Sequence, residues 1–421
     1  MAFDVQHWRS LFPALTSGQV FLDNPGGTQI ARPALDRMQR YLVETNANRG
    51  GAFPTSRQTD AVLDSARQAM ATFVNASRPD EIVFGPNMTS LTLAASRSLA
   101  TRLIPDDEIV VTRLDHDANV SPWLQAAEAS GARVRWADFD VEDCRLRMDD
   151  LLALIGPRTR LVAVGFASNA VGTINDVARV AAAAHQVGAL CYVDAVQLAP
   201  HRAIDVQALD CDFLALSVYK LFGPHAGALY GRFELLDELP AFNVRPASQR
   251  APRKFETGTQ NHEGIAGTLG ALEYIAQIGH SHEPTRAIEA TGADDNLRPA
   301  LKHGMRAIET YERPLTARLV EGLQALPGVR IFGLTEPEDL AERVPTVSIR
   351  IEGHAPQRVA HQLGERGIYV WDGNFYAPSV TERLGLEQSG GLIRLGLAHY
   401  NTAEEVDFLL ENLEHIAKQG A

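Results

Sequence analysis

The pattern of apolar and polar positions between about residues 60 and 235 alternates between two periods. Short apolar runs typical of buried strands lie at 81–85, 107–114, 132–139, 158–168, 189–196, 210–218 and 225–232. Segments with apolar residues at helical spacing include 60–75, 89–103, 121–131 and 176–188. Short apolar runs alternating with helices are typical of a mostly parallel sheet that helices cover on both faces. The pattern predicts an α/β core built on a seven-stranded sheet.

After about residue 265 the pattern changes. Helical spacing recurs at 264–279, 307–327 and 403–418, and strand-like runs lie at 329–333, 346–353, 368–373 and 392–398. A chain of 421 residues is long for a single core. We therefore expect an N-terminal arm at 1–20, a large domain at 21–280 and a smaller α+β domain at 281–421, with the arm joining the small domain.

Composition narrows the classes of function. The formal net charge of −13 argues against nucleic acid and anionic membranes as main partners. No apolar run reaches the ~20 residues that span a bilayer. The first residues lack a basic segment followed by a long apolar one, so no signal peptide is expected and the cytoplasm is the predicted location.

Polar side chains follow five of the predicted strands. They are Thr89, His116, Asn169, Asp194, Gln197, Ser217 and Lys220. Ligands of open α/β sheets bind beyond the carboxyl ends of the strands. If the sheet is as predicted, these side chains converge on one crevice.

The types of these residues indicate a cofactor. A lysine beside apolar walls has a lowered pKa and becomes an amine nucleophile. An aspartate opposite a pyridinium nitrogen would keep that nitrogen protonated, an imidazole stacks on a flat ring, and the amides that open the helix at Thr89 would bind phosphate. Together they describe a site for pyridoxal 5′-phosphate (PLP).

Other interpretations of the same residues have less support in the sequence. A lone lysine at a strand end is usually a solvated charge, and a lone aspartate is often a helix cap. His116 between Asp115 and Asp117 has no second ligand cluster at a useful spacing, so no metal is predicted. A G-x-G-x-x-G opening a helix after an early strand, which a nicotinamide-dependent dehydrogenase needs, is not found.

Several segments carry a family resemblance. They are "YVDAVQLAPHRAIDVQALDCDFLALSVYKLFGP" (192–224), "FLDNPGGTQIARPAL" (21–35), "LDHDANVSPW" (114–123) and "IRLGLAHYNTAEEVDFLLENL" (393–413). They resemble class V aminotransferases, which are fold-type I PLP enzymes, and most closely the cysteine-desulfurase-like branch. The resemblance implies the PLP-dependent transferase fold, with a large sheet domain and a smaller C-terminal domain.

The resemblance also implies roles for the cofactor site. Lys220 would form the Schiff base with PLP and later move the substrate's α-proton, and Asp194 would pair with the pyridine nitrogen. His116 would stack on the ring. Asn169 and Gln197 would lie near the cofactor's 3′-oxygen and the substrate. The residues that would bind the phosphate are Met88, Thr89, Ser217 and Tyr219.

Two further roles follow from the resemblance. Thr259, in "ETGTQN", would reach the phosphate in the partner's site, so the family implies a homodimer. Arg394 would bind the substrate carboxylate, for which the bidentate geometry of a guanidinium is suited.

The chain departs from the desulfurase pattern at two places. Tyr219 stands where desulfurases usually have a histidine. The segment 370–378, where they carry a nucleophilic cysteine, has none, and Tyr376 falls near that position, where we expect it to contact substrate.

The chain's three cysteines are poor substitutes for that nucleophile. Cys191 lies in an apolar strand and is typical of a core residue. Cys211 precedes a strand and is expected to be partly buried. Cys144 has acidic neighbours, which raise a thiol pKa.

We therefore expect a PLP-dependent enzyme on a small amino acid, with desulfurase-like elimination at Cβ but no persulfide cysteine. Transamination and epimerisation or racemisation are the alternatives. The presence of Lys220, Asp194 and Arg394 disfavours a non-catalytic protein of the same fold.

Overall fold

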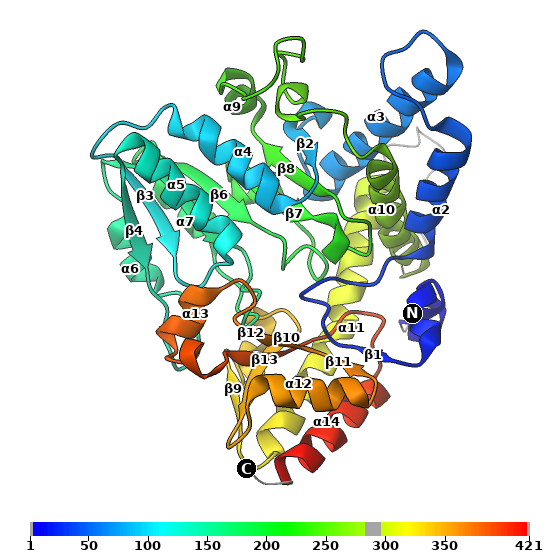
Figure 1. The fold of residues 1–421 in the computed structure, drawn as a ribbon, viewed down its shortest axis with the longest axis vertical. Helices are drawn as coiled ribbons and strands as arrows, with labels where there is room; N and C mark the ends of the chain where they lie inside the picture. The colour runs from blue at the N-terminus through cyan, green and yellow to red at the C-terminus, as the bar shows by residue number, and fades with distance from the viewer. Residues whose placement is uncertain (1–2, 283–295, 419–421) are drawn as a thin grey trace.

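A seven-stranded sheet forms the centre of the larger part of the molecule (Figure 1). The structure is a computed structural model that describes residues 3–282 and 296–418. The strands are β2 (Ile82–Gly85), β3 (Glu108–Thr112), β4 (Arg133–Ala137), β5 (Thr159–Gly165), β6 (Leu190–Asp194), β7 (Phe213–Ser217) and β8 (Gly227–Gly231). Their order is β2-β8-β7-β6-β5-β3-β4, and β8 alone runs in the direction opposite to the other six strands. The predicted mostly parallel sheet is confirmed.

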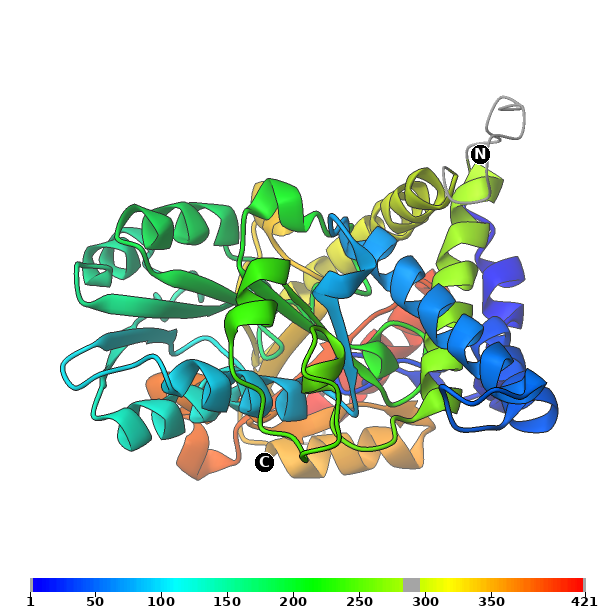
Figure 2. The ribbon, with the colours of Figure 1, turned by 90° about the horizontal axis from the view of Figure 1, so that it is seen from above.

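Alternate side chains of the central strands pack into two separate cores, as a sheet buried on both faces requires. Val110 and Val162 join one cluster, whereas their neighbours Ile109 and Leu161 join the other. The first cluster includes residues of α3 (Pro54–Val74), α7 (Val177–Gln186) and α10 (His262–His282), and the second includes residues of α4 (Met88–Ala100) and α5 (Ser121–Ser130). Figure 2 shows helices on both faces of this sheet.

A second, antiparallel sheet lies in the C-terminal part, with the order β12-β13-β10-β9. Its strands are β9 (Val329–Phe332), β10 (Thr346–Ile351), β12 (Trp371–Gly373) and β13 (Leu392–Gly396). Residues of α11 (Leu297–Ala325), α12 (Pro356–Glu365) and α14 (Ala403–Lys418) share its apolar core. The predicted strand at 368–373 is in fact two strands, because β11 (Ile368–Tyr369) turns away to pair with β1 (Val20–Phe21).

Helix α11 begins at Leu297, earlier than the predicted start at 307. Its first turns pack closely on α10 through two glycines. A Cβ on Gly279 would lie 1.9 Å from the Ala300 carbonyl oxygen, and one on Gly304 would lie 2.2 Å from that of Ile275. This contact between helices stabilises a segment whose own apolar spacing is weak.

The N-terminal arm contacts both parts of the molecule. Trp8 and Phe12 belong to a core of the large sheet, whereas Val20 belongs to the core of the small sheet. The predicted boundary near 280 falls at the end of α10, and residues 283–295 lie outside the described residues. The division at 20/21 and 280/281 stays a prediction.

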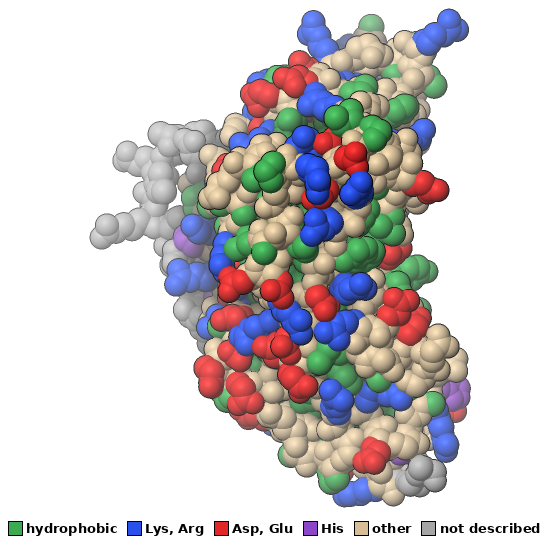
Figure 3. All heavy atoms as spheres, turned by 90° about the vertical axis from the view of Figure 1, so that its left-hand side faces the viewer, with side chains coloured by type: hydrophobic (Ala, Val, Ile, Leu, Met, Phe, Trp, Pro, Cys, Tyr) green, Lys and Arg blue, Asp and Glu red, His purple; other side chains and the backbone are tan. Residues whose placement is uncertain are grey.

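Several short helices were not expected from the sequence. They are α2 (Arg32–Arg40), α6 (Met148–Leu154), α8 (Val206–Leu209), α9 (Phe233–Glu238), α12 and α13 (Pro378–Arg383). Within the described residues, no helix is long and apolar enough to cross a bilayer. On the face drawn in Figure 3, basic and acidic side chains are interspersed.

Candidate active site

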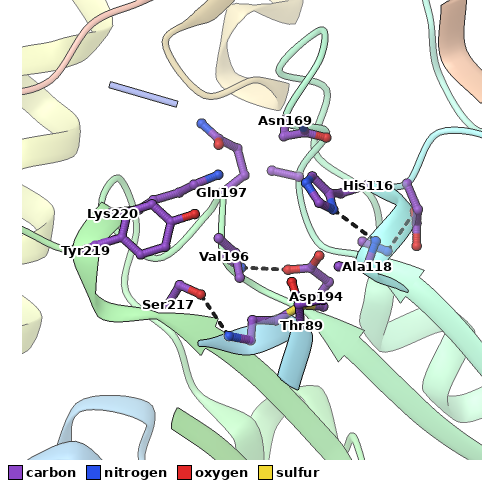
Figure 4. Close-up of a pocket in the computed structure, with 14 residues that line it drawn as sticks. Thr89, His116, Ala118, Asn169, Asp194, Val196, Gln197, Ser217, Tyr219 and Lys220 are labelled. Atoms are coloured by element: carbon purple, nitrogen blue, oxygen red, sulfur yellow. Dashed lines mark hydrogen bonds between the residues drawn. The ribbon is translucent and has the colours of Figure 1, made fainter. Parts of the chain in front are cut away.

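A cavity opens at the carboxyl ends of the parallel strands. All of the predicted cofactor-binding residues except Thr259 line it: Met88, Thr89, His116, Asn169, Asp194, Gln197, Ser217, Tyr219 and Lys220. Figure 4 shows their side chains around one space, with Lys220 and Gln197 extending into it. Because parallel strands end at the same edge, residues as far apart in sequence as Met88 and Lys220 meet here.

The turn that carries Lys220 is held by the N-terminal segment. Lys220 ends a short 3₁₀ turn, Val218–Lys220, directly after β7. The backbone N–H of Thr28 donates to the Tyr219 carbonyl at 3.1 Å, and its hydroxyl accepts the Phe222 N–H at 2.9 Å. Phe222 is fully buried with φ of 61°, so its amide depends on this acceptor. Gly27 packs on the Tyr219 ring, which a Cβ would approach at 3.2 Å.

The Lys220 amine is buried, and its surroundings lower its pKa. Its residue is 6% exposed, and desolvation, with the neighbouring Arg394, lowers the pKa of Lys220 from 10.5 to about 8. Asp194 opposes this shift. Burial raises the pKa of Asp194 to about 6, against the hydrogen bond that the Val196 N–H donates at 2.9 Å. A lysine that loses its proton near neutral pH is suited to nucleophilic attack and proton transfer.

His116 presents a neutral ring to the cavity. Burial, followed by the charges of Lys220 and Arg394, lowers the pKa of His116 to about 3. Its Nδ1 accepts the Ala118 N–H at 3.0 Å, so the neutral imidazole carries its proton on Nε2. The Tyr376 ring stacks on His116, with centroids 5.8 Å apart and planes at 20°.

The carboxylate of Asp115 was missed as a site residue. It lines the cavity and accepts the Thr112 hydroxyl, the Gly165 N–H and the Asn119 amide at 2.6, 2.9 and 2.7 Å. Desolvation outweighs these donors and raises the pKa of Asp115 to about 7. The signal in the sequence is its place directly before His116 in the loop after β3, where acidic neighbours of a histidine suggest a metal site first.

The start of α4 provides an anion site beside the cavity. Asn87 caps the helix by accepting the Ser90 N–H at 2.8 Å, and the Ser217 hydroxyl accepts the Met88 N–H at 3.0 Å. Thr89 lies between them in the first turn. The partial positive charge of a helix N-terminus would stabilise a phosphate here.

The polar groups around the cavity fit PLP. The side-chain oxygens Asn169 Oδ1 and Gln197 Oε1 are buried and have no hydrogen-bond partner among the described residues. Their amide nitrogens are bonded to the Phe375 carbonyl and to the Thr346 hydroxyl, at 2.8 and 2.9 Å. Buried polar atoms without partners are rare in proteins, and a ligand with polar ring substituents would pair with them.

Arg394, on β13 of the small sheet, does not line the cavity itself but contacts Asn169, which does. It is 4% exposed, and its Nη2 donates to Asp23 Oδ1 at 2.9 Å while Nη1 donates to the Asn169 carbonyl at 3.2 Å. The Phe375 ring lies 4.5 Å from the guanidinium carbon. Asp23 was not predicted as a site residue, although it lies in "FLDNPGG", one of the segments of the resemblance.

Tyr376 and Thr259 lie outside the cofactor cavity. Tyr376 is 76% exposed and lines an adjoining hollow together with Thr89, His116 and Tyr219. Its carbonyl accepts the Asp117 N–H at 2.7 Å, which fixes the loop against the His116 turn. Thr259 is exposed and does not line its own chain's cavity.

All three cysteines are fully buried. Cys211, expected to be partly buried, is also enclosed, because β7 lies inside the sheet. For Cys144, desolvation is the main cause that raises the thiol pKa to about 12, and the charge of Asp143 adds to it. None of the three, which all lie within the described residues, lines the cavity.

Comparisons with known proteins find relatives among the class V aminotransferases and cysteine desulfurases. The family model "Aminotransferase class-V" matches residues 20–295 and 285–409. The "Aminotransferase-like protein FGM3" of Gibberella zeae is 37% identical over 99% of both chains. A cysteine desulfurase of Synechococcus elongatus is 33% identical over 99% of this chain and 64% of its own length. The apo structure of the cysteine desulfurase from Thermococcus onnurineus NA1 superposes with a TM-score of 0.86 at 28% identity, covering 100% of both chains. The chain belongs to the class V aminotransferase family of PLP-dependent enzymes, in its cysteine-desulfurase-like part.

Proposed function

We propose that the protein is a PLP-dependent lyase that eliminates a group from Cβ of a small amino acid, without a persulfide-forming cysteine. One observation carries this proposal. The buried, partly neutral amine of Lys220 faces the same cavity as Asp194 and His116, whereas the chain's three cysteines are buried elsewhere with raised pKa values.

The residues of the cavity would divide the work as follows. Lys220 would hold the cofactor covalently through Nζ, Asp194 would pair with its pyridine nitrogen, and the neutral His116 ring would lie flat against it. The start of α4 and Ser217 would bind the phosphate. When bound, PLP draws electrons from the substrate's Cα.

On the substrate side, Arg394 would bind the α-carboxylate through its guanidinium and so fix the amino acid in the cavity. Lys220, as a free amine, would take the α-proton at Nζ. The pKa of about 8 suits an amine that must accept and return a proton near neutral pH. A leaving group on Cβ would depart once the α-proton is gone.

Transamination is the second candidate, since the relative from Gibberella zeae is named aminotransferase-like. In that case Lys220 would take the α-proton and pass it on at Nζ, and no group would leave Cβ. Epimerisation, with a proton returned to the opposite face, is the third.

A product assay separates these activities. The purified holoenzyme is incubated with a panel of amino acids while its visible absorbance is followed, and pyruvate, ammonia, sulfide and 2-oxo acids are measured. Elimination gives pyruvate and ammonia from cysteine or serine, together with sulfide in the case of cysteine. A 2-oxo acid with the substrate's own side chain would indicate transamination.

A variant in which Cys144, Cys191 and Cys211 are replaced by alanine tests the second part of the proposal. We expect it to retain the lyase products. Alanine and elemental sulfur formed from cysteine by the wild type, and lost in the variant, would contradict the proposal and establish a persulfide cysteine.

We further propose that the enzyme is a homodimer in which Thr259 contributes to the partner's site. The exposed position of Thr259 supports this, as do the exposed apolar side chains of Leu42, Val43 and Phe53 on one segment. Mixing inactive Lys220→Ala and Thr259→Ala proteins under exchange conditions should restore activity in mixed dimers, and light scattering gives the mass. The cytoplasmic location stays a prediction.

A further inference from the structure

The side chain of Asp23 is bonded to the arginine that the proposed function assigns to the substrate carboxylate. The Asp23–Arg394 pair has an N–O distance of 2.9 Å, and the two side chains are 27% and 4% exposed. Asp23 follows β1, and its backbone forms a bridge with Gly396 at the end of β13, two residues after Arg394. The N-terminal segment therefore brings a carboxylate to the guanidinium without any ligand.

The Asp23 side chain is not needed for the local turn. The turn is closed by the main chain, because the Asp23 carbonyl accepts the N–H groups of Gly26 and Gly27 at 3.0 and 3.2 Å. The carboxylate folds over Gly26, where a Cβ would lie 2.5 Å from Oδ2. Among the described residues, Arg394 is the one with which the Asp23 carboxylate forms an ion pair.

Arg394 has limited capacity for a second carboxylate. Nη2 is bonded to Asp23 and Nη1 to the Asn169 carbonyl, while the buried Nε has no partner within the described chain. The Phe375 ring covers the guanidinium from one side. An incoming carboxylate must therefore displace Asp23 from the guanidinium edge or lie beside it, and two adjacent carboxylates repel each other.

Asp23 also acts on the amine side of the site. Its charge is one of the causes that raise the pKa of Lys220, which Arg394 lowers, so both groups act on the position where a substrate amine enters. A ligand that carries an ammonium group would offer Asp23 a new partner when its carboxylate takes Arg394. A simple carboxylate would leave Asp23 without one.

We infer that Asp23 is a specificity-determining residue, which admits zwitterionic amino acids to Arg394 and weakens the binding of monoanionic carboxylates that lack an α-ammonium group. The inference rests on the proposed function, in which Arg394 binds the α-carboxylate. The same discrimination weakens the hold on a 2-oxo acid product such as pyruvate.

The test compares two probes on the holoenzyme by calorimetric titration: propionate, a monoanion, and 2-aminoisobutyrate, a zwitterion that has no α-proton for Lys220 to remove. Asp23→Asn keeps the shape of the side chain and removes its charge. We expect it to bind propionate about tenfold more tightly, since a charge-assisted hydrogen bond contributes roughly this factor, and to bind 2-aminoisobutyrate no more tightly than the wild type. Arg394→Met should lose both.

Two controls accompany this test. Asp407→Asn removes the same charge from an aspartate–arginine pair remote from the site, Asp407–Arg318 at 2.6 Å, and should change neither affinity. Asp23→Ser removes the carboxylate by truncation and repeats the measurement if the asparagine variant unfolds. If both variants unfold, the wild type decides: equal affinities for the two probes would overturn the inference.

The possible outcomes separate the inference from the proposed function. The proposed function fails if amino acids leave the absorbance of the wild-type holoenzyme unchanged and no products are released. The inference fails if the wild type does respond to amino acids but the propionate affinity of Asp23→Asn is within about twofold of the wild-type affinity or lower. The inference requires that Arg394 binds propionate once the charge of Asp23 is removed. Absence of propionate binding in every variant would therefore also overturn it.

Discussion

The buried ammonium of Lys220 should cost the cofactor-free protein stability in a pH-dependent manner. The pKa of Lys220 falls from 10.5 to about 8 on folding, mainly through desolvation. Between pH 8 and 10.5 the unfolded chain therefore binds more protons at this residue than the folded chain, so the free energy of unfolding rises with pH over this window. Below about pH 8 the full penalty applies.

The magnitude follows from the two pKa values. A difference of about 2.5 pKa units at 1.36 kcal/mol per unit corresponds to about 3 kcal/mol. Lys220→Met keeps an unbranched side chain but has no charge to bury. Its stability advantage over the wild type should therefore be about 3 kcal/mol larger at pH 7 than at pH 10.5.

Urea unfolding of the cofactor-free wild type and variant at both pH values measures this difference. Lys302→Met, which replaces an exposed lysine on α11, is the matched control and should show no comparable change with pH. An advantage of Lys220→Met that is the same at pH 7 and 10.5 would refute the view that Lys220 is desolvated and carries a lowered pKa.

Three further outcomes are expected. Thr28→Val should lower the free energy of unfolding by about 2 kcal/mol in urea titrations, because the buried Phe222 N–H loses its acceptor, whereas Thr28→Ser should keep most of it. His116, with a pKa of about 3, stays neutral between pH 5 and 8, so His116→Phe should bind PLP with an unchanged pH dependence over that range in fluorescence titrations; a new or lost titration step would contradict this. Trp123→Ala should cost about 3–5 kcal/mol in denaturant unfolding, since the 1% exposed ring packs edge-on against Tyr192, and a smaller cost would mean that α5 collapses into the gap.

The strands of the large sheet could be predicted because each carries its own signal. Runs such as "IVV" in β3 and "LVAV" in β5 are apolar at every position, and only a strand buried on both faces accommodates them. The polar residues after them had to meet, since parallel strands end at one edge of the sheet. Lys220, Asp194 and His116 follow three of these strands, and they line one cavity as the sequence predicts.

Other features depend on contacts that no local pattern carries. The split of 368–373 into β11 and β12 arises because β1, some 350 residues earlier, pairs with one half. The early start of α11 depends on glycines that let two helices touch. Cys144 and Cys211 are fully buried because the large sheet and the C-terminal part of the molecule enclose them. Their polar neighbours in the sequence did not indicate this burial.

The sequence by itself therefore determined the sheet and the strand-end residues, because hydrophobic periodicity and residue type are local properties of the chain. The tertiary structure alone decided the state of the substrate side of the site. Arg394 lies in the small sheet, Asp23 in the N-terminal segment and Lys220 directly after β7. The first two meet because the backbone of Asp23 forms a bridge with Gly396 at the end of β13. The electrostatic interaction between charges depends on their separation and burial, and folding sets both.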